Sequence, residues 1–379
     1  MSDDDGALGD DAPGAAPYDR ETINRALTAC RAAIVGKIGA YLDARRNEPG
    51  AYAGLYDLLR DYPFRVGKML RPTMCISAAR ALGGAGHAAL TVAAALELYH
   101  NAFLIHDDIE DGSESRRGKE TLHRRVGVAR AINAGDATNV MSVGLLLENL
   151  SVVGVAKALH ILHEIELMAR QSAEGQAMEL DWVASNASEL ADQDYFVMCT
   201  KKTCWYSFIT PLRTGCIVGW HPSRELVLSD ALERITRFGM TLGIAFQIQD
   251  DLLNLKGQME TYGKEIGGDI YEGKRTLMLN HVIRHSPDSA RILEILATPR
   301  GGKTPADVAV IFDEMKRCGS IEHGWDVAHT QAARAKELFQ ACDFLADTTP
   351  LEPDEEWTCE YVDGRFLREL VDYVIYRTV

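Results

Sequence analysis

Cysteine pairs of the kind that bind zinc or build disulfide frameworks are missing from this sequence of 379 residues. Its eight cysteines include no CxxC pair, which favours reduced thiols and a cytoplasmic location. Basic residues are in the minority, 40 against 55 acidic ones, and the net charge of −15 argues against a nucleic-acid scaffold. No charge-free apolar run approaches the roughly 20 residues of a membrane span, and residues 1–19 contain no Lys or Arg that could begin a signal peptide.

Proline is absent from 73–210 and from 223–286, the two most regular parts of the chain. Proline breaks helices and central strands alike, so its absence does not choose between them. The periodicity does, because segments such as 88–111 and 232–255 place apolar residues three and four apart. The sequence therefore predicts an all-α protein, with a disordered acidic tail in 1–17 and a single bundle of roughly a dozen mostly antiparallel helices in 18–379. Breaks between helices are expected near Gly112, Gly135, Pro211 and Gly267, among other glycines.

The motif HDDIEDGSESRRG at 106–118 carries the clearest chemical signal. Asp107, Asp108 and Asp111 lie at the end of an apolar segment, and positions four apart share one face of a helix. Three carboxylates so close together repel one another unless a cation lies among them. Mg²⁺ prefers oxygen ligands and usually takes one or two carboxylates together with substrate phosphates. Taken alone, the motif would also fit a solvated acidic helix end.

A second cluster repeats the same spacing. Asp250, Asp251 and Asn254 again end an apolar segment, FQIQDDLLN. Two such clusters could face each other across a helical cavity and hold several cations around one polyanion, so a chance occurrence explains the pair poorly.

Basic residues accompany both clusters, and guanidinium and ammonium groups are the usual partners of phosphate oxygens. They are Lys68 and Arg71 after Gly67, Arg116 and Arg117, Lys202 beside Thr203, and Lys264 and Lys274 around Asp269. Together with the metal-type ligands, they describe a site for one diphosphate or two.

The ordered set of motifs resembles the trans-isoprenyl diphosphate synthases (polyprenyl synthetases), and is most similar to a geranylgeranyl diphosphate synthase. The matching blocks are GKxLRP at 67–72, HxxxLIHDDIxD with RRG at 100–118, KT at 202–203, FQxxDD at 246–251 and GKxxGGDIxEGKRT at 263–276. The resemblance implies the isoprenoid synthase fold with a deep central cavity. It also implies head-to-tail condensation of isopentenyl diphosphate with an allylic diphosphate (dimethylallyl, geranyl or farnesyl), using several Mg²⁺ ions, about three in each site.

The resemblance assigns roles by matching position. Metal ligands would be Asp107, Asp108, Asp111, Asp250, Asp251 and Asn254. The allylic diphosphate would be bound by Arg116, Lys202 and Lys264, and isopentenyl diphosphate by Gly67, Lys68, Arg71, His100 and Arg117. Thr203 and Gln247 would lie beside the reacting carbons, Asp269 and Lys274 would belong to the block that closes over the site, and Arg377 is a candidate C-terminal base. Asn254 stands where the family often has Asp, which predicts weaker metal binding there and retained activity.

The resemblance also implies a homodimer and a rule for product length. The growing chain is expected to run along the helix that ends in Asp107. The fifth residue before this aspartate is Ala102, which is small, and the fourth is Phe103, which is bulky, with Tyr99 one turn further back. This combination favours geranylgeranyl diphosphate, with farnesyl and geranylfarnesyl diphosphates as alternatives.

Two other classes share part of the pattern. A class I terpene cyclase would use the aspartates but has no reason to keep Lys68, Arg71 and Arg117. A non-catalytic subunit of a heteromeric synthase would tend to lose aspartates, whereas this chain has both clusters. The whole set therefore favours the chain-elongating prenyltransferase.

Overall fold

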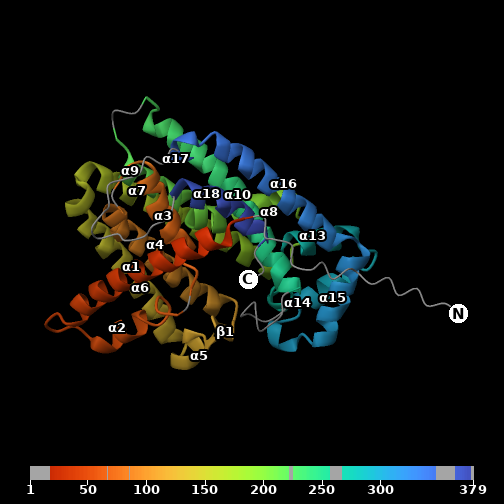
Figure 1. The fold of residues 1–379 in the computed structure, drawn as a ribbon. Coiled ribbons are helices and arrows are strands. Elements are labelled where there is room, and N and C mark those ends of the chain that lie inside the picture. Colours follow the sequence, from red (N-terminus) through yellow and green to blue (C-terminus); the bar gives the residue numbers. More distant parts are fainter. Residues whose placement is uncertain are drawn as a thin grey trace.

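The computed structural model describes residues 18–65, 67–84, 86–221, 225–256, 267–346 and 363–376, and most of these residues are helical (Figure 1). The predicted all-α class is confirmed. Within these ranges the strands are β1 (Ser115–Arg116) and β2 (Lys119–Glu120), which pair antiparallel as a short hairpin. The acidic tail of 1–17, Lys264 and Arg377 lie outside the described residues.

In chain order, the helices of the first half of the chain are α1 (Arg20–Arg46), α2 (Ala53–Leu59), α3 (Leu70–Ala81), α4 (Gly86–Glu110), α5 (Leu122–Val126), α6 (Val128–Val153) and α7 (Val155–Ala184). The second half forms α8 (Asp192–Cys199), the π-helix η1 (Thr200–Ile209), α9 (Thr210–Gly219), α10 (Leu228–Lys256), α12 (Gly268–Glu272), α13 (Leu277–His285), α14 (Ser289–Ala297), the short 3₁₀ helix η2 (Arg300–Gly302), α15 (Pro305–Arg317), α16 (Ser320–Gln340), α17 (Asp343–Ala346) and α18 (Asp363–Tyr376).

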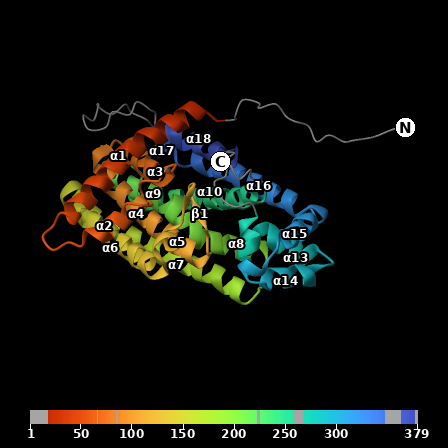
Figure 2. The ribbon, with the colours of Figure 1, turned by 90° about the horizontal axis from the view of Figure 1, so that it is seen from below.

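The core is built around α4, which packs along α6 and also contacts α3, α1 and α9. Val92, Leu98 and Ile105 of α4 are all buried, as expected for a helix enclosed by other helices. By length and composition α4 could cross a membrane, but 78% of its apolar window is buried inside the protein, as in a core helix. On the other side of the bundle, α10 packs between α16 and η1. Figures 1 and 2 show α13, α14 and α15 gathered at the end of the bundle opposite α2.

The two ends of the described chain are tied together. Asp19 caps α1 by accepting the N–H groups of Glu21 and Thr22, and its own backbone N–H donates to the Glu369 carboxylate at 2.9 Å. Arg365 donates to the Asp19 carboxylate at 2.7 Å. These contacts hold α18 beside α1, where it can reach the site described below.

Two of the expected breaks are wrong. Gly135 lies inside α6, where its lack of a side chain allows His106 of α4 to pack against the helix backbone. Pro211 lies in a helical run that continues from residue 192 to 219. It occupies the first turn of α9, directly after the π-helix, and a proline in the first turn does not interrupt a helix.

Candidate active site

A cavity of about 1060 Å³ opens between α3, α4, α7, η1, α10 and the segment 269–276, and α18 contributes Tyr373. It brings together most of the residues singled out from the sequence. Those that line it are Gly67, Lys68, Arg71, His100, Phe103, Asp107, Arg116, Arg117, Lys202, Thr203, Gln247, Asp250, Asp251, Asp269 and Lys274. Five expected residues lie outside this lining: Tyr99, Ala102, Asp108, Asp111 and Asn254.

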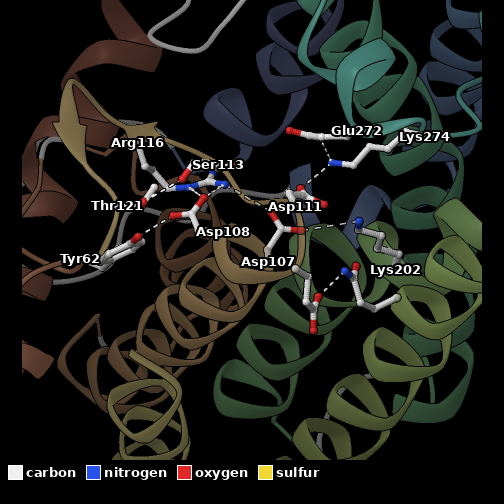
Figure 3. A network of polar contacts seen from close by, with 12 residues as sticks. Tyr62, Asp107, Asp108, Asp111, Ser113, Arg116, Thr121, Lys202, Glu272 and Lys274 are labelled. Carbon is white, nitrogen blue, oxygen red and sulfur yellow. Dashed lines mark hydrogen bonds and ion pairs between the residues drawn. The ribbon is translucent and has the colours of Figure 1, made fainter. Parts of the chain in front are cut away.

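Asp107 faces the cavity from the last turn of α4 (Figure 3). One of its carboxylate oxygens lies 3.7 Å from the Lys202 ammonium and the other lies 3.3 Å from the Arg116 guanidinium. Lys202 also pairs with Glu179 of α7. Burial alone would lower the pKa of Lys202, but Glu179 and Asp107 outweigh it and hold that pKa above its ordinary value. Lys202 therefore stays a cation beside Asp107, as a diphosphate site requires.

The π-helix η1 carries Lys202 and Thr203 into the cavity. Long π-helical stretches are rare and frequently mark functional sites, because the wider turn changes which side chains face one side. The Thr203 hydroxyl donates to the Gln247 side-chain oxygen of α10 at 2.7 Å. Gly175 of α7 allows η1 to approach, since a Cβ at this glycine would collide with the Lys202 backbone. The sequence contains no signal for this irregular turn.

Asp108 is placed differently from expectation. Its side chain is fully buried and does not line the cavity. One oxygen accepts from the Arg116 Nε at 2.7 Å, and the other accepts from the Tyr62 hydroxyl at 2.5 Å. Successive residues on a helix point about 100° apart, and here Asp107 faces the cavity while Asp108 points toward Tyr62 and Arg116. In this conformation Asp108 anchors Arg116 and is not positioned as a metal ligand.

Asp111 is paired with Lys274, which comes 163 residues later in the sequence. Lys274 donates to its carboxylate at 2.7 Å and also lies 2.9 Å from the Glu272 carboxylate (Figure 3). Burial raises the pKa of Asp111 to about 7, Lys274 opposes this, and repulsion from Asp107 adds to it. The block that follows the second cluster thus reaches directly to the first.

Asp250 and Asp251 of the second cluster lie near a third carboxylate, that of Asp269. Asp251 accepts from the Tyr195 hydroxyl at 2.7 Å and from the Gln247 amide at 2.8 Å. Burial raises its pKa well above the ordinary value, and repulsion from Asp269 and Asp250 raises it further. Crowded carboxylate oxygens that destabilise one another's charge are the donor set that hard divalent cations prefer. No three acidic, His or Cys side chains of the described residues converge on one point, so Mg²⁺ would be held here by one or two carboxylates together with substrate phosphates.

Asn254 anchors Gly267 and Asp269, at the start of the next described segment. Its side-chain oxygen accepts the Asp269 N–H at 3.2 Å, and its backbone carbonyl accepts the Gly267 N–H at 2.8 Å. The uncharged amide serves this anchoring role without adding a further negative charge beside Asp251 and Asp269.

At the other end of the cavity, basic groups surround one buried acid. Arg71 donates to the Ser207 hydroxyl at 2.7 Å and lies 3.2 Å from His100 Nε2. Burial and the neighbouring arginines lower the pKa of His100 well below its usual value, so the neutral ring can accept from Arg71. Glu97, one turn before His100, is the buried acid. Burial raises its pKa, and Arg117 and Arg71 oppose the rise.

Several lining residues escaped the sequence analysis. They include Glu97, Glu179, Tyr195, Tyr206, Arg275 and Tyr373. Glu97 could have been found from its spacing, since it lies three residues before His100 on the same face of an apolar helix. Glu179 could have been noticed in the same way, because it is an acidic residue within an amphipathic segment. The tyrosines have no comparable signal, because each comes from a helix that folding alone brings to the cavity.

Fold and site together define the class: a helical isoprenoid synthase whose cavity is equipped for diphosphates. The chain belongs to the polyprenyl synthetase family, whose model matches residues 53–315. It is 31% identical to the octaprenyl diphosphate synthase of Escherichia coli (strain K12), over 74% of this chain and 81% of that protein. It is 30% identical to the geranylgeranyl pyrophosphate synthase of Geoglobus acetivorans, over 86% of this chain and 91% of that protein.

Solved structures agree with this assignment. The geranylgeranyl pyrophosphate synthetase of Pyrococcus horikoshii matches with a TM-score of 0.76 and 28% identity, covering 94% of this chain and 98% of its own. The polyprenyl synthase of Caulobacter crescentus, complexed with calcium and isoprenyl diphosphate, matches with a TM-score of 0.74 and 29% identity over the same shares. The protein is therefore an enzyme, a trans-prenyltransferase of the isoprenyl diphosphate synthase type.

Proposed function

We propose that this enzyme uses Mg²⁺ to condense isopentenyl diphosphate with an allylic diphosphate, and that its main product is geranylgeranyl diphosphate. The observation that carries the proposal is the shared cavity, in which both aspartate clusters and two groups of basic side chains meet. The relatives named above differ in product, one octaprenyl and one geranylgeranyl, so product length rests on this chain's own residues.

The allylic diphosphate would lie between the two aspartate clusters. Asp107, Asp250 and Asp251 would hold Mg²⁺, which neutralises charge on the departing diphosphate when bound. Lys202 and Arg116 offer cations to the same group at fixed positions, and such pre-arranged charge lowers the barrier to carbon–oxygen cleavage.

Isopentenyl diphosphate would occupy the opposite end, with its diphosphate on Lys68, Arg71 and Arg117. Its double bond attacks the allylic carbon, a new carbon–carbon bond forms, and a proton leaves the adjacent carbon for the released diphosphate. No protein nucleophile takes part. Apolar side chains of the wall, including Phe103 and Phe246, exclude the water that would convert the allylic cation into an alcohol.

The second group of basic side chains, Lys68, Arg71 and Arg117, also argues against a terpene cyclase, which ionises one allylic diphosphate and needs no second one. The non-catalytic reading is disfavoured because Asp107 of the first cluster and Asp250 and Asp251 of the second line the cavity.

Product length is proposed to depend on Phe103. Its ring lines the cavity. The centre of this ring lies 5.6 Å from that of Tyr206 and 6.2 Å from that of Tyr99. Ala102, by contrast, is fully buried and faces away from the cavity lining, so the expectation that it forms part of the pocket is not met. The rings of Phe103, Tyr99 and Tyr206 form one aromatic cluster. Such a cluster on the helix that ends in Asp107 fits a prenyl product of intermediate length, which is blocked from growing further.

A homodimer is proposed from the surface of α6 and α7. Apolar side chains are exposed along both helices, most of them at three- and four-residue spacing. They are Val140, Val143, Leu147, Leu150, Val155 and Leu159. A second copy of the chain would cover this apolar surface. We also propose a cytoplasmic location, supported by the seven described cysteines, all of which are free thiols.

The direct test is an incubation with Mg²⁺, isopentenyl diphosphate and each allylic primer in turn, with products identified by mass spectrometry. Geranylgeranyl diphosphate is the expected product, and EDTA should abolish it. Cyclic hydrocarbons formed without isopentenyl diphosphate would instead establish a terpene cyclase, and inactivity with every primer would refute the proposal.

A further inference from the structure

The segment from Asp61 to Arg65, between α2 and α3, supports the hairpin that carries both substrate-facing arginines. The Arg65 side chain is 1% exposed and donates to four groups, one of them the Lys119 carbonyl at 3.5 Å. Its Nη1 reaches the Arg116 carbonyl at 3.0 Å, its Nη2 reaches the Glu120 carbonyl at 2.7 Å, and its Nε reaches the Asp61 carboxylate at 3.0 Å. One buried guanidinium thus ties β1 and β2 to the chain before α3.

The hairpin needs such support because its turn is strained. Arg117 and Gly118 join the two strands with φ angles of +53° and +71°. Two positive φ angles in a two-residue turn are normal for glycine or asparagine, but uncommon for arginine. A side chain held in that region costs about 1–3 kcal/mol and persists only where the surroundings enforce it. Here the hydrogen bonds from Arg65 to carbonyls on both strands enforce it.

Tyr62 supports the same hairpin from another side (Figure 3). Its hydroxyl donates to Asp108, whose other oxygen accepts from Arg116 Nε. The hydroxyl also accepts the Leu122 N–H at 3.3 Å, just beyond β2, and the Tyr62 carbonyl accepts from Arg117 at 3.4 Å. Tyr62 is therefore hydrogen-bonded to Arg117 directly and linked to Arg116 through the Asp108 carboxylate.

Arg117 packs so closely against Gly67 that the hairpin has little room to move. Its guanidinium lies so close to Gly67 that a Cβ there would be 2.8 Å from the Arg117 Cζ. A hairpin displaced by even a fraction of this distance would move Arg117 away from the basic end of the cavity, or into the backbone before α3.

We propose that Tyr62 and Arg65 are positioning residues, which aim Arg116 at the allylic diphosphate and Arg117 at the isopentenyl diphosphate. Neither residue lines the cavity, so each acts only through the hairpin. This inference rests on the proposed function, which assigns a diphosphate to each arginine.

The test compares Tyr62→Phe, Arg65→Gln and a control, Arg237→Gln, whose exposed side chain binds Glu233 on the same helix, α10. Arg65→Gln should raise the KM of both substrates about tenfold, the order expected when a buried charge-assisted hydrogen bond is lost. Tyr62→Phe should raise the KM of the allylic substrate more than that of isopentenyl diphosphate, because it acts on Arg116 through Asp108. In both variants KM should change more than kcat, and the control should match the wild type.

A merely structural role gives a different result. It would lower Tm and the active fraction, so that kcat falls while the remaining folded enzyme keeps the wild-type KM, and this outcome would overturn the proposal. If Arg65→Gln does not fold, Tyr62→Phe decides, since it removes only a hydroxyl. If the wild type is inactive with every primer, the proposed function fails, and calorimetric titration with Mg²⁺ and inorganic diphosphate still decides this inference. Weaker binding in the folded variants supports positioning, and unchanged binding refutes it.

Discussion

At the residue scale, two neighbouring aspartates have different surroundings and so different expected roles. Asp107 lies in the cavity between Lys202 and Arg116, whereas Asp108 is fully buried between Arg116 and Tyr62. The first is available to a metal ion and the second is not, although both belong to one motif.

Asp107→Asn keeps the side-chain volume and removes the charge. We expect kcat to fall by about 10²–10³-fold, the loss typical of removing one group that stabilises charge in the transition state. Circular dichroism and Tm should stay near those of the wild type, because the side chain faces the cavity. Asp326→Asn, an exposed change on α16, is the control. Wild-type turnover in Asp107→Asn would contradict the assignment.

Arg71 should act mainly on one substrate. It lies in the cavity against His100 and Ser207, within the group of basic side chains assigned above to isopentenyl diphosphate. Arg71→Ala should therefore raise the KM for isopentenyl diphosphate by about tenfold or more, and that for the allylic primer much less. Equal effects in steady-state kinetics would mean that the two diphosphates are not separated as proposed.

Phe103 and Ala102 are adjacent but should respond differently. Phe103→Ala removes an aromatic ring from the cavity wall, so mass spectrometry should show products longer than those of the wild type. Ala102→Phe places a ring in a fully buried position, which costs about 1–3 kcal/mol through overpacking. A lower Tm is its main expected effect. An unchanged product distribution in Phe103→Ala would show that this residue does not set chain length.

At the scale of the elements, function depends on an irregular helix held by close packing. The π-helix η1 contacts both α7 and α10, and its position sets Lys202 and Thr203. The crossing with α7 is possible only because Gly175 has no side chain.

Gly175→Ala should displace η1, since the new methyl group meets the backbone of Lys202. Activity should fall by an order of magnitude or more, because displacements near an angstrom can cost about 10²-fold. Gly36→Ala is the matched control. It lies in α1 with open space around it, and should be neutral or stabilising by up to about 1 kcal/mol. Equal Tm and activity in the two variants would show that η1 tolerates movement.

At the scale of the whole molecule, the apolar surface of α6 and α7 matters for assembly. Leu147 lies within it, and its side chain is well exposed in the single chain. Burying such a surface against a second copy would contribute favourable free energy in proportion to the apolar area removed from water.

The wild type should sediment near twice the chain mass of 41.8 kDa at micromolar concentration. Leu147→Asp should shift it toward the monomer, because a carboxylate buried at an apolar interface is costly. Val310→Asp on α15 makes the same exchange at an exposed apolar site outside this surface and should leave the mass unchanged. A wild-type monomer, or an unaffected dimer in Leu147→Asp, would count against this interface.

Local patterns in the sequence were enough to predict the all-α fold and the end of α4 near Gly112, and they singled out many of the residues that line the cavity. These features depend on residues three or four positions apart, or on side-chain chemistry that needs no knowledge of packing. Two of the expected helix breaks did not occur. Gly135 lies inside α6, where His106 packs against it, and Pro211 lies in the first turn of α9, where the π-helix changes to an α-helix.

The functional direction of each side chain depended on contacts between distant segments. Asp108 turned away from the cavity because Tyr62, 46 residues earlier, binds it, and Asp111 is paired with Lys274, 163 residues later. Arg65 supports the hairpin across more than 50 residues. Periodicity predicts that a helix has an apolar and a polar face. Which face meets the cavity depends on the helices that cover the other faces, and those helices come together only when the chain folds.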